Sequence, residues 1–541
     1  MSITFVPATE RDLTRASVVG ARVDARHALL PLTSIVAILA IGLAYSGRTR
    51  ASEFPGPALR AVAPINLNTV DDARLLETRL AAVFAHQPDR EFAARALLQF
   101  IERTRADGAL PNVGAIARAT ATAESVTGTA SLLAFSERLR VQRERSTHTG
   151  AIAATTLPLF TADEMTVLKP ALVVRTTQTF ARTTLGYAGV YVGGFYVVWF
   201  LWWRRRVRGD ALLLAAAHLL TAIGFALLLS RQDPLRDTML FVRYTEGVLL
   251  GLGVMVAVSL VNFRRAAFLR FSYLPLMAAL SLSALLLLFG SGPGTSAAKV
   301  NLGPVQPIEA VRLLLALFLA GYFARRWELL RQVHSERVGQ YRVPRWLTLP
   351  RLPYVLPVVV GVGAALLFFF LQKDLGPALF LSCVFLALYA AARGRVGMAI
   401  TGSALLVAGF YAGYALNISD TLVERIRMWQ SPWDNGVRGG DQVAQSVWAL
   451  SSGGLFGSGL GFGDTRYLPA GHTDLVLAAI GEELGAAGLL TVAAVYALVT
   501  WRGFRIALTA ANDYGYFLAT AMTLFVIVPV LVMASGMVGL T

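Results

Sequence analysis

Long apolar runs are the feature that most constrains what this chain can fold into. About eleven segments have the roughly 17–25 residues that a helix needs to cross the hydrocarbon core of a bilayer. They lie near 28–46, 185–203, 210–230, 240–261, 273–290, 307–324, 354–372, 374–392, 396–416, 475–500 and 515–535. Of the 541 residues, 55% are hydrophobic and only 15% are charged, which is unusual for a soluble protein. The pattern predicts an all-α fold, a polytopic bundle of membrane-spanning helices.

Two of the runs need a closer look. The run at 28–46 has the position of a signal peptide, but "AYSGRTRASEF" after it offers only a weak small-residue cleavage site. We interpret this run as an uncleaved anchor. The run at 374–392 is interrupted by Gly376-Pro377 and is the weakest of the predicted spans. Cys383, the one cysteine, cannot form a disulfide within the chain.

Basic residues are distributed unevenly between the loops. If the N-terminus lies inside, the inner loops contain 22 arginines. The short outer loops then contain only Arg231, Arg236, Lys299 and Lys373. This asymmetry follows the positive-inside rule and predicts a multi-pass membrane protein with a cytoplasmic N-terminus. The net charge of +16 is therefore mainly a matter of topology, and we expect no nucleic acid among the partners.

A long stretch at 47–184 lies outside in this topology. The segment "DDARLLETRLAAVF" predicts an amphipathic helix with Asn68 or Thr69 as its N-cap. The apolar face of this helix is formed by Leu76, Leu80 and Val83. A second helix is predicted in "EFAARALLQFIER", and the remainder, rich in Thr, Ala and Ser, is predicted to be partly loose. We expect a helical outer domain or spacer that is dispensable for chemistry, with partner docking as the alternative.

The second outer stretch, 417–474, combines many glycines with polar and aromatic residues. The segment "DQVAQSVWAL" predicts a short amphipathic helix at the membrane interface. The segment "SSGGLFGSGLGFG" has the composition of a phosphate-binding loop. It lacks the Lys-Ser/Thr ending of a P-loop, so a flexible turn is the simpler interpretation. The sequence contains no zinc-ligand spacing among its six histidines and no G-x-S-x-G element.

Six motifs in 205–541 resemble, in order, those of the SEDS family, the FtsW/RodA/SpoVE group of cell-wall polymerases. They are "NLGPVQPIEAVRL" (301–313), "QKDLGPAL" (372–379), "ERIRMWQSPW" (424–433), "GDQVAQS" (440–446), "GGLFGSGLG" (453–461) and "YLPAGHTDLVLAAIGEELG" (467–485). The resemblance divides the chain into a tail and first span (1–46), the outer stretch (47–184), an additional span (185–204) and the family-like region. Within that region, 417–474 corresponds to the large catalytic loop outside the membrane.

The chain departs from the family pattern at several places. Arg312 replaces a lysine, Lys373 a proline and Ser431 an aspartate, and Pro-Glu-Ala-His becomes "PAGH" at 469–472. Family members continue beyond the position of "MASGMVGLT" with a Pro/Gly-rich outer loop and a final span. The resemblance therefore predicts that the full product extends past Thr541.

The resemblance also implies a function. SEDS proteins polymerise lipid II, a disaccharide-pentapeptide on undecaprenyl pyrophosphate, at the outer face of the bacterial cytoplasmic membrane. The expected partners are lipid II, membrane lipids and a class B penicillin-binding protein, in division, elongation or sporulation. Two other classes stay open. A lipid II flippase or transporter would share the span count and central polar groups, and a polytopic ligase of the O-antigen type would also use a lipid pyrophosphate.

The predicted catalytic residue is Asp474, just before the apolar run "LVLAAI". A carboxylate at the outer boundary of the membrane can take the proton of an acceptor hydroxyl as the glycosidic bond forms. The alternative is an N-cap role, since Asp favours that position. A pyrophosphate leaving group favours cations, for which the candidates are Arg312, Arg425 and Arg427. A divalent cation, Mg²⁺ or Mn²⁺, is the possible cofactor in the same role.

The other predicted substrate-binding residues rest on the same motifs. They are Glu309, Asp374, Gln442, Gln445, Ser446, His472, Glu482 and Glu483. Each has a plainer alternative. Glu482 and Glu483 would otherwise pair with arginines inside the bundle, because ionisable groups at membrane depth are functional or paired. Asp374 and Glu309 are evenly balanced between structure and substrate positioning, and His472 fits a turn residue better than a base.

Overall fold

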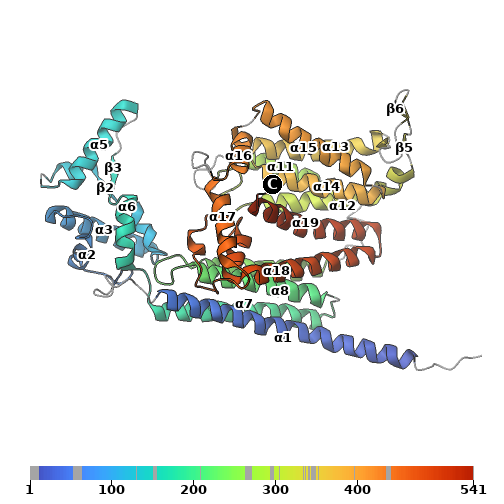
Figure 1. Ribbon diagram of the computed structural model, residues 1–541, viewed down its shortest axis with the longest axis horizontal. Helices are drawn as coiled ribbons and strands as arrows, with labels where there is room; N and C mark the ends of the chain where they lie inside the picture. Colours follow the sequence, from blue (N-terminus) through green and yellow to red (C-terminus); the bar gives the residue numbers. More distant parts are fainter. Residues whose placement is uncertain are drawn as a thin grey trace, which may run out of the picture. The chain divides into compact units, whose positions relative to one another are not determined.

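A computed structural model gives the arrangement of the elements (Figure 1). It describes residues 11–52, 64–129, 131–149, 155–207, 209–261, 271–292, 298–303, 305–332, 334–335, 337–338, 341–342, 349–350, 352–394, 396–418, 420–433 and 440–539. The chain divides into two compact units. The first unit is Met1–Val256 with Ser458–Arg466, and the second is Ala257–Gly457 with Tyr467–Thr541.

All eleven predicted spans coincide with α-helices. In the first unit these are α1 (Arg11–Ser52), α7 (Thr177–Arg204), α8 (Ala211–Arg231) and α9 (Leu240–Ser259). In the second unit they are α11 (Leu274–Phe289), α12 (Ile308–Gln332), α13 (Leu352–Leu371), α14 (Leu375–Arg393), α15 (Gly397–Ala415), α18 (Val476–Leu508) and α19 (Asp513–Met537). Among the described residues, nine helices are long and apolar enough to cross a membrane. The predicted fold class, a helical membrane bundle, is confirmed.

The two helices outside that group depart in length or charge. The helix α11 has only 16 residues. The helix α12 carries Glu309 and Arg312 in its first turns and runs on to Gln332, eight residues past its predicted end at 324. The weakest predicted span is a continuous helix, α14, because Pro377 falls in the first turn, where a missing N–H costs no helical hydrogen bond.

The described residues of the stretch predicted to lie outside, 47–184, form a small domain with its own apolar core, which we call the outer domain. Its helices are α2 (Ala73–Leu80), α3 (Gln87–Asp107), α4 (Ala123–Thr127), α5 (Ala134–Thr149) and α6 (Ala162–Leu168), with 3₁₀ turns at Val113–Arg118 and Lys169–Ala171. Both predicted helices are present, as α2 and α3. The part predicted to be loose supplies Ile116, Phe135 and Leu159 to the same buried cluster as Leu76 and Leu97. These residues are packed, and positions 130 and 150–154 of the same part lie outside the described residues.

The outer domain also contains two small sheets, so it is not wholly helical. In the first, β1 (Ile65–Asn66) pairs in parallel with β4 (Leu172–Val173), with Ile65 opposite Leu172. In the second, β2 (Thr120–Thr122) is antiparallel to β3 (Thr156–Pro158), with Ala121 opposite Leu157. The strands bring the two ends of the domain together, because β1 and β4 lie near its first and last described residues.

The N-cap of α2 differs from the prediction. Asp72 is the cap, and its carboxylate accepts a hydrogen bond from the Arg74 N–H. Asn68 is used elsewhere: its side chain accepts from the Leu110 N–H at 2.8 Å and donates to the Val174 carbonyl at 2.6 Å. The predicted cap at Asn68 or Thr69 is therefore wrong, because the helix begins later and Asn68 ties distant segments of the domain together.

The second unit is built around α12. This helix contacts α11, α13, α14 and α19, which Figure 1 draws in colours from yellow-green to dark red. Phe318 and Phe323 of α12 are fully buried and pack with Phe369 of α13 and Phe517 of α19. The Trp327 indole N–H donates to an Asp513 carboxylate oxygen at 3.0 Å, which joins the last part of α12 to the start of α19.

Shorter elements complete the second unit. Between α12 and α13, β5 (His334–Ser335) pairs with β8 (Leu349–Pro350), and β6 (Arg337–Val338) with β7 (Tyr341–Arg342), both antiparallel. The predicted interfacial segment forms a helix, α17 (Gly440–Gly453), which packs against α18. Before it lies α16 (Asp420–Gln430). A 3₁₀ turn at Thr465–Tyr467, where the chain passes from the first unit back to the second, precedes α18.

Candidate functional site

A tight turn presents Asp474 at the start of α18. Ala470 has a positive φ of 48°, an uncommon conformation for a residue with a side chain. Its carbonyl oxygen accepts hydrogen bonds from the Thr473 N–H at 2.9 Å and the Leu475 N–H at 3.1 Å. The Thr473 hydroxyl lies 3.2 Å from the same oxygen. The turn folds the chain back on itself just before the helix and leaves Asp474 on its outside.

The Asp474 side chain is exposed. Helix α18 begins at Val476, its N-cap is Leu475, and no side chain caps it. The structure therefore does not support the N-cap role that was the alternative for Asp474. Within the described ranges, the Asp474 carboxylate makes no hydrogen bond or ion pair with another side chain. A carboxylate in this state keeps its lone pairs available for a hydroxyl proton.

Glu482 and Glu483 are buried on α18, just before a break in the helix. At Gly485 the backbone has φ 65° and ψ −166°, so two helical segments meet there. The glycine-rich loop supplies the carbonyls that the second segment lacks. Gly454 accepts from the Ala486 N–H at 2.9 Å, and Leu455 accepts from the Ala487 N–H at 3.0 Å.

The loop approaches this break so closely that side chains are excluded. A methyl group at Gly457 would overlap the Glu483 carbonyl and lie 2.5 Å from the Leu484 nitrogen. One at Gly485 would lie 2.6 Å from the Leu455 carbonyl carbon. The first part of the glycine-rich segment is thus a packed structural element, and its interpretation as a flexible turn is wrong.

A second group of charged residues gathers at the first turn of α14. Asp374 occupies the N-cap position of that helix and is half-buried. Burial is the largest influence on its carboxyl and raises the pKa above the usual value, while the nearby Arg312 and Arg425 guanidinium groups act in the opposite direction. Four predicted residues, Glu309, Arg312, Asp374 and Arg425, therefore share one electrostatic environment, which we call the Asp374 cluster.

Arg312 is the central cation of the Asp374 cluster. Its guanidinium lies 2.6 Å from a Glu309 carboxylate oxygen and 5.4 Å from the centre of the Phe380 ring. Its Nε atom is buried without a hydrogen-bond partner in the described part of the chain. Such a group is costly unless another acceptor reaches it, so the arginine has donor capacity left for an anion.

Helix α16 supplies the second cation. Leu422 and Ile426 face inward, while Arg425 and Arg427 are exposed. The Trp429 indole N–H donates to the Gly539 carbonyl at 2.8 Å and ties the helix to the residues after α19. Arg425 is thus on a fixed element and has an exposed guanidinium, a combination suited to a phosphate-bearing ligand.

The predicted residues on α17 and beside Asp474 do not join the Asp374 cluster through any hydrogen bond or ion pair found in the described ranges. Ser446 is buried, and its hydroxyl lies 2.8 Å from the Val443 carbonyl and 2.9 Å from that of Met537. Gln442 is exposed, Gln445 half-buried and His472 exposed. The geometry of Ser446 favours a packing role between α17 and α19.

Gln372 was missed as a site residue although it begins the motif "QKDLGPAL". It is fully buried, and its side-chain N–H group donates to the Ser283 carbonyl of α11 at 2.9 Å. Its backbone carbonyl accepts from the Lys299 N–H at 3.0 Å. Gln372 therefore fixes the connection from α13 to α14, which positions Asp374. The signal in the sequence was an amide side chain between two apolar runs.

No group of three His, Cys, Asp or Glu side chains able to hold a metal occurs in the described ranges. The carboxylates of the Asp374 cluster belong to an arrangement that already contains two arginines. The donor set therefore resembles a cationic anion-binding site more than a preformed metal cage.

The fold and these sites define a polytopic helical membrane protein with charged groups at the ends of its spans. The chain belongs to the FTSW_RODA_SPOVE family, described as cell cycle proteins, whose model matches residues 210–541. This confirms the resemblance predicted for 205–541. The N-terminal extension, residues 1–209, lies outside the match.

Individual relatives agree with that membership. The chain is 30% identical over 236 residues to peptidoglycan glycosyltransferase RodA of Mycobacterium leprae (strain TN), covering 44% of this chain and 49% of the relative. It is 26% identical over 346 residues to stage V sporulation protein E of Bacillus subtilis (strain 168), covering 62% and 89%. The chain spans about half the length of the mycobacterial relatives that it matches.

A solved chain from a peptidoglycan synthase complex is also similar. That complex is described as coordinating polymerization and crosslinking structurally. The identity is 22%, the TM-score is 0.47, and the match covers 62% of this chain and 89% of that one.

Proposed function

We propose that this protein is a peptidoglycan glycosyltransferase that polymerises lipid II into glycan strands, for cell division or elongation. Membership of the FtsW/RodA/SpoVE family supports the proposal, as do relatives named peptidoglycan glycosyltransferases. The observation that carries it within this chain is Asp474. An exposed carboxylate with no partner in the described ranges stands immediately before an apolar helix, where a lipid-linked sugar would present its head group.

Asp474 would act as the general base. The acceptor hydroxyl oxygen of one lipid II attacks the anomeric carbon of the growing chain. The bond from that carbon to the pyrophosphate oxygen breaks, and its electron pair leaves with the lipid pyrophosphate. The hydroxyl proton passes to the Asp474 carboxylate. Proton transfer to a positioned base contributes roughly 10²–10⁴ in rate.

The Asp374 cluster would bind the pyrophosphate. Arg312 has an unused buried donor and Arg425 an exposed guanidinium, and guanidinium groups pair with two phosphate oxygens at once. Asp374 would keep both arginines oriented between turnovers. If Mg²⁺ or Mn²⁺ takes part, Asp374 is the carboxylate best placed to hold it beside the phosphates, since Mg²⁺ sites commonly use one or two carboxylates and phosphate oxygens. Such an ion would neutralise charge on the leaving group.

The orientation and partners belong to the same proposal. The protein is an integral membrane protein by its helices and its family. The arginine-rich loops support a cytoplasmic N-terminus in the inner membrane, with the segment that contains Asp474 outside. A class B penicillin-binding protein is the proposed partner that crosslinks the product.

Purified full-length protein incubated with lipid II in detergent tests the activity. We expect glycan polymer on a gel, with and without the transpeptidase partner. A flippase or transporter would make no polymer under these conditions, because there is no second compartment. A ligase of the O-antigen type would accept a different lipid-linked sugar. Failure to make polymer in the presence of the partner would overturn the proposal.

A further inference from the structure

The end of α1 and the second half of the glycine-rich segment lie in direct backbone contact. Both belong to the first unit of the fold. A methyl group added at Gly47 would overlap the Leu460 carbonyl oxygen and lie 3.1 Å from the Phe462 ring. From the other side, one added at Gly461 would lie 2.5 Å from the Arg48 nitrogen and 3.0 Å from the Ala44 carbonyl. Neither position has room for a side chain.

This contact joins a part of the chain outside the family match to a part inside it. α1 lies in the N-terminal extension, outside the residues that match the family. The loop at 458–466 lies inside the match and ends eight residues before Asp474. Residues Gly461 and Thr465 of the loop are buried, although the neighbouring Phe462 and Arg466 are exposed. The loop therefore rests on α1 through its backbone and small residues.

The end of α1 is itself firmly held. Arg48 is only 5% exposed and donates from Nε to the Gln232 carbonyl at 2.6 Å. Earlier in α1, the Ser34 hydroxyl lies 3.1 Å from Nε2 of His218, a buried side chain of α8. These buried contacts fix the end of α1 against α8 and the loop that follows α8.

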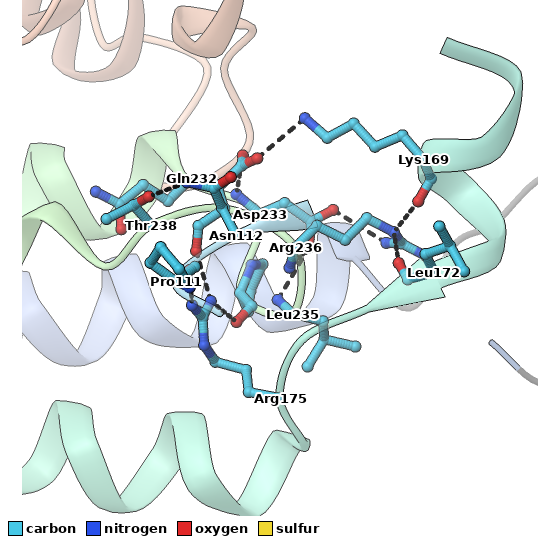
Figure 2. Close-up of polar contacts among 12 residues, drawn as sticks. Pro111, Asn112, Lys169, Leu172, Arg175, Gln232, Asp233, Leu235, Arg236 and Thr238 are labelled. Carbon is cyan, nitrogen blue, oxygen red and sulfur yellow. Dashed lines mark hydrogen bonds and ion pairs between the residues drawn. The ribbon is translucent and has the colours of Figure 1, made fainter. Parts of the chain in front are cut away.

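The loop after α8, which Arg48 contacts at Gln232, also forms hydrogen bonds with the outer domain (Figure 2). Arg175 is buried and donates to the Pro111, Pro234 and Asp237 carbonyls, at 2.6, 3.0 and 2.5 Å. Arg236 donates in turn to the carbonyls of Lys169, Pro170 and Leu172 at 3.0, 2.7 and 3.1 Å. The loop after α8, from Gln232 to Thr238, thus contacts both Arg48 and the outer domain.

We propose that the N-terminal extension is a built-in positioning element for the glycosyl transfer. The end of α1 holds the loop at 458–466, and the loop in turn sets the path of the chain toward Asp474. Gly47 is a positioning residue, because it contacts the loop and not the reacting atoms. The catalytic part of this inference rests on the proposed function. The holding of the loop by α1 stands on the packing alone.

Two glycines on α1 provide a matched pair for the test. Gly47→Ala places a methyl group in the backbone of the loop, whereas a methyl group at Gly42 meets nothing within 4 Å. Alanine is the better helix former at both positions, so the helix itself gains in both variants. We expect faster amide hydrogen exchange at 458–466 in Gly47→Ala only. We also expect kcat/KM for polymerisation to fall at least about tenfold, because a shift of about 1 Å near the chemistry can cost about 10²-fold.

The possible outcomes distinguish the contact between α1 and the loop, the positioning role and the proposed function. Unchanged exchange at 458–466 in folded Gly47→Ala would overturn the contact. Faster exchange with normal polymerisation would overturn the positioning role and leave the proposed function intact. If the unmodified protein makes no polymer, the proposed function fails, while the exchange difference still decides whether α1 holds the loop.

A second variant covers the case in which Gly47→Ala does not fold. Phe462→Ala removes a ring that is 55% exposed and introduces no overlap. It should change exchange and kcat/KM in the same direction by a smaller factor, and no change in either would count against the proposal.

Discussion

Asp374 and Asp474 stand at similar places in the sequence and in different surroundings. Each lies just before an apolar helix, α14 or α18. Asp374 is half-buried, occupies the N-cap position and lies within the electrostatic influence of Arg312 and Arg425. Asp474 is exposed, precedes the N-cap by one residue and has no side-chain partner in the described ranges.

The difference supports different proposed tasks for the two carboxylates. Arg312 and Arg425 lie close enough to act on the Asp374 carboxyl, which supports the proposed task of holding these cations in place. The charge of Asp474 is not engaged and can accept a proton from an incoming hydroxyl. A pattern of aspartate before an apolar run therefore does not define a role. The role follows from the groups that the fold brings alongside.

The largest effect is expected at Asp474. Asp474→Asn keeps the size of the side chain and its capping ability but removes its negative charge and basicity. We expect polymerisation of lipid II to fall by at least roughly a hundredfold, because the general base is lost. Glycan products from the purified variant, resolved on a gel, give the measurement.

Expression, membrane insertion and melting temperature of this variant serve as controls. All three should stay normal, since no side chain in the described part of the chain depends on the Asp474 carboxylate. Near-normal polymer from Asp474→Asn would remove this residue from the mechanism. The candidates for the general base would then be Asp374, Glu309 and Glu482.

A smaller effect is expected at Arg425, which belongs to the Asp374 side of the comparison. Arg425→Gln removes the charge of an exposed guanidinium near Asp374. Hydrogen bonds to charged groups contribute about 1.5–3 kcal/mol, and exposure lowers that figure, so we expect KM for lipid II to rise about tenfold. Steady-state kinetics at fixed ionic strength measure it.

Glu424→Gln is the matched control on the same helix. It removes an exposed charge of the opposite sign next to Arg425. Exposed substitutions of this kind usually change energies by less than about 0.5 kcal/mol, so KM should stay within about twofold. A fall in KM of similar size for Glu424→Gln would show that α16 acts through its overall charge, because this substitution changes the charge in the opposite direction, and the specific role of Arg425 would be lost.

The helices were predictable because the bilayer fixes their length. A run of about 20 apolar residues has few other stable states, so even the run interrupted by Pro377 formed a helix. Local features such as helix caps were predicted less well than the helices themselves. Asp72 rather than Asn68 caps α2, because Asn68 is taken up by Leu110 and Val174, which are far away in the sequence.

The sequence predicted the residues of the candidate site but not which of them lie close together. The motifs identified Arg425 and Asp374, but their proximity joins residues 51 positions apart and depends on how α16 packs. The glycine-rich segment looked flexible because composition alone cannot show a backbone approach. Its glycines are required by the break at Gly485 and by the end of α1, both of which are tertiary features.

The smallest effect concerns the stability contributed by Asp374. Burial raises the pKa of its carboxyl above the value in an unfolded chain, so the folded protein holds this proton more tightly. The resulting stability is present below the ordinary Asp pKa of about 3.9 and is lost as pH rises through the folded pKa. Asn at this position stays neutral at every pH. We therefore expect Asp374→Asn to melt at a higher temperature than the unmodified protein at neutral pH, with the difference shrinking toward acidic pH. Asp474→Asn is the matched control, because an exposed carboxylate without a partner leaves no buried charge to remove. A lower melting temperature for Asp374→Asn at neutral pH would show instead that the attraction of Arg312 and Arg425 exceeds the cost of burial, and the two carboxylates would then differ in the opposite sense.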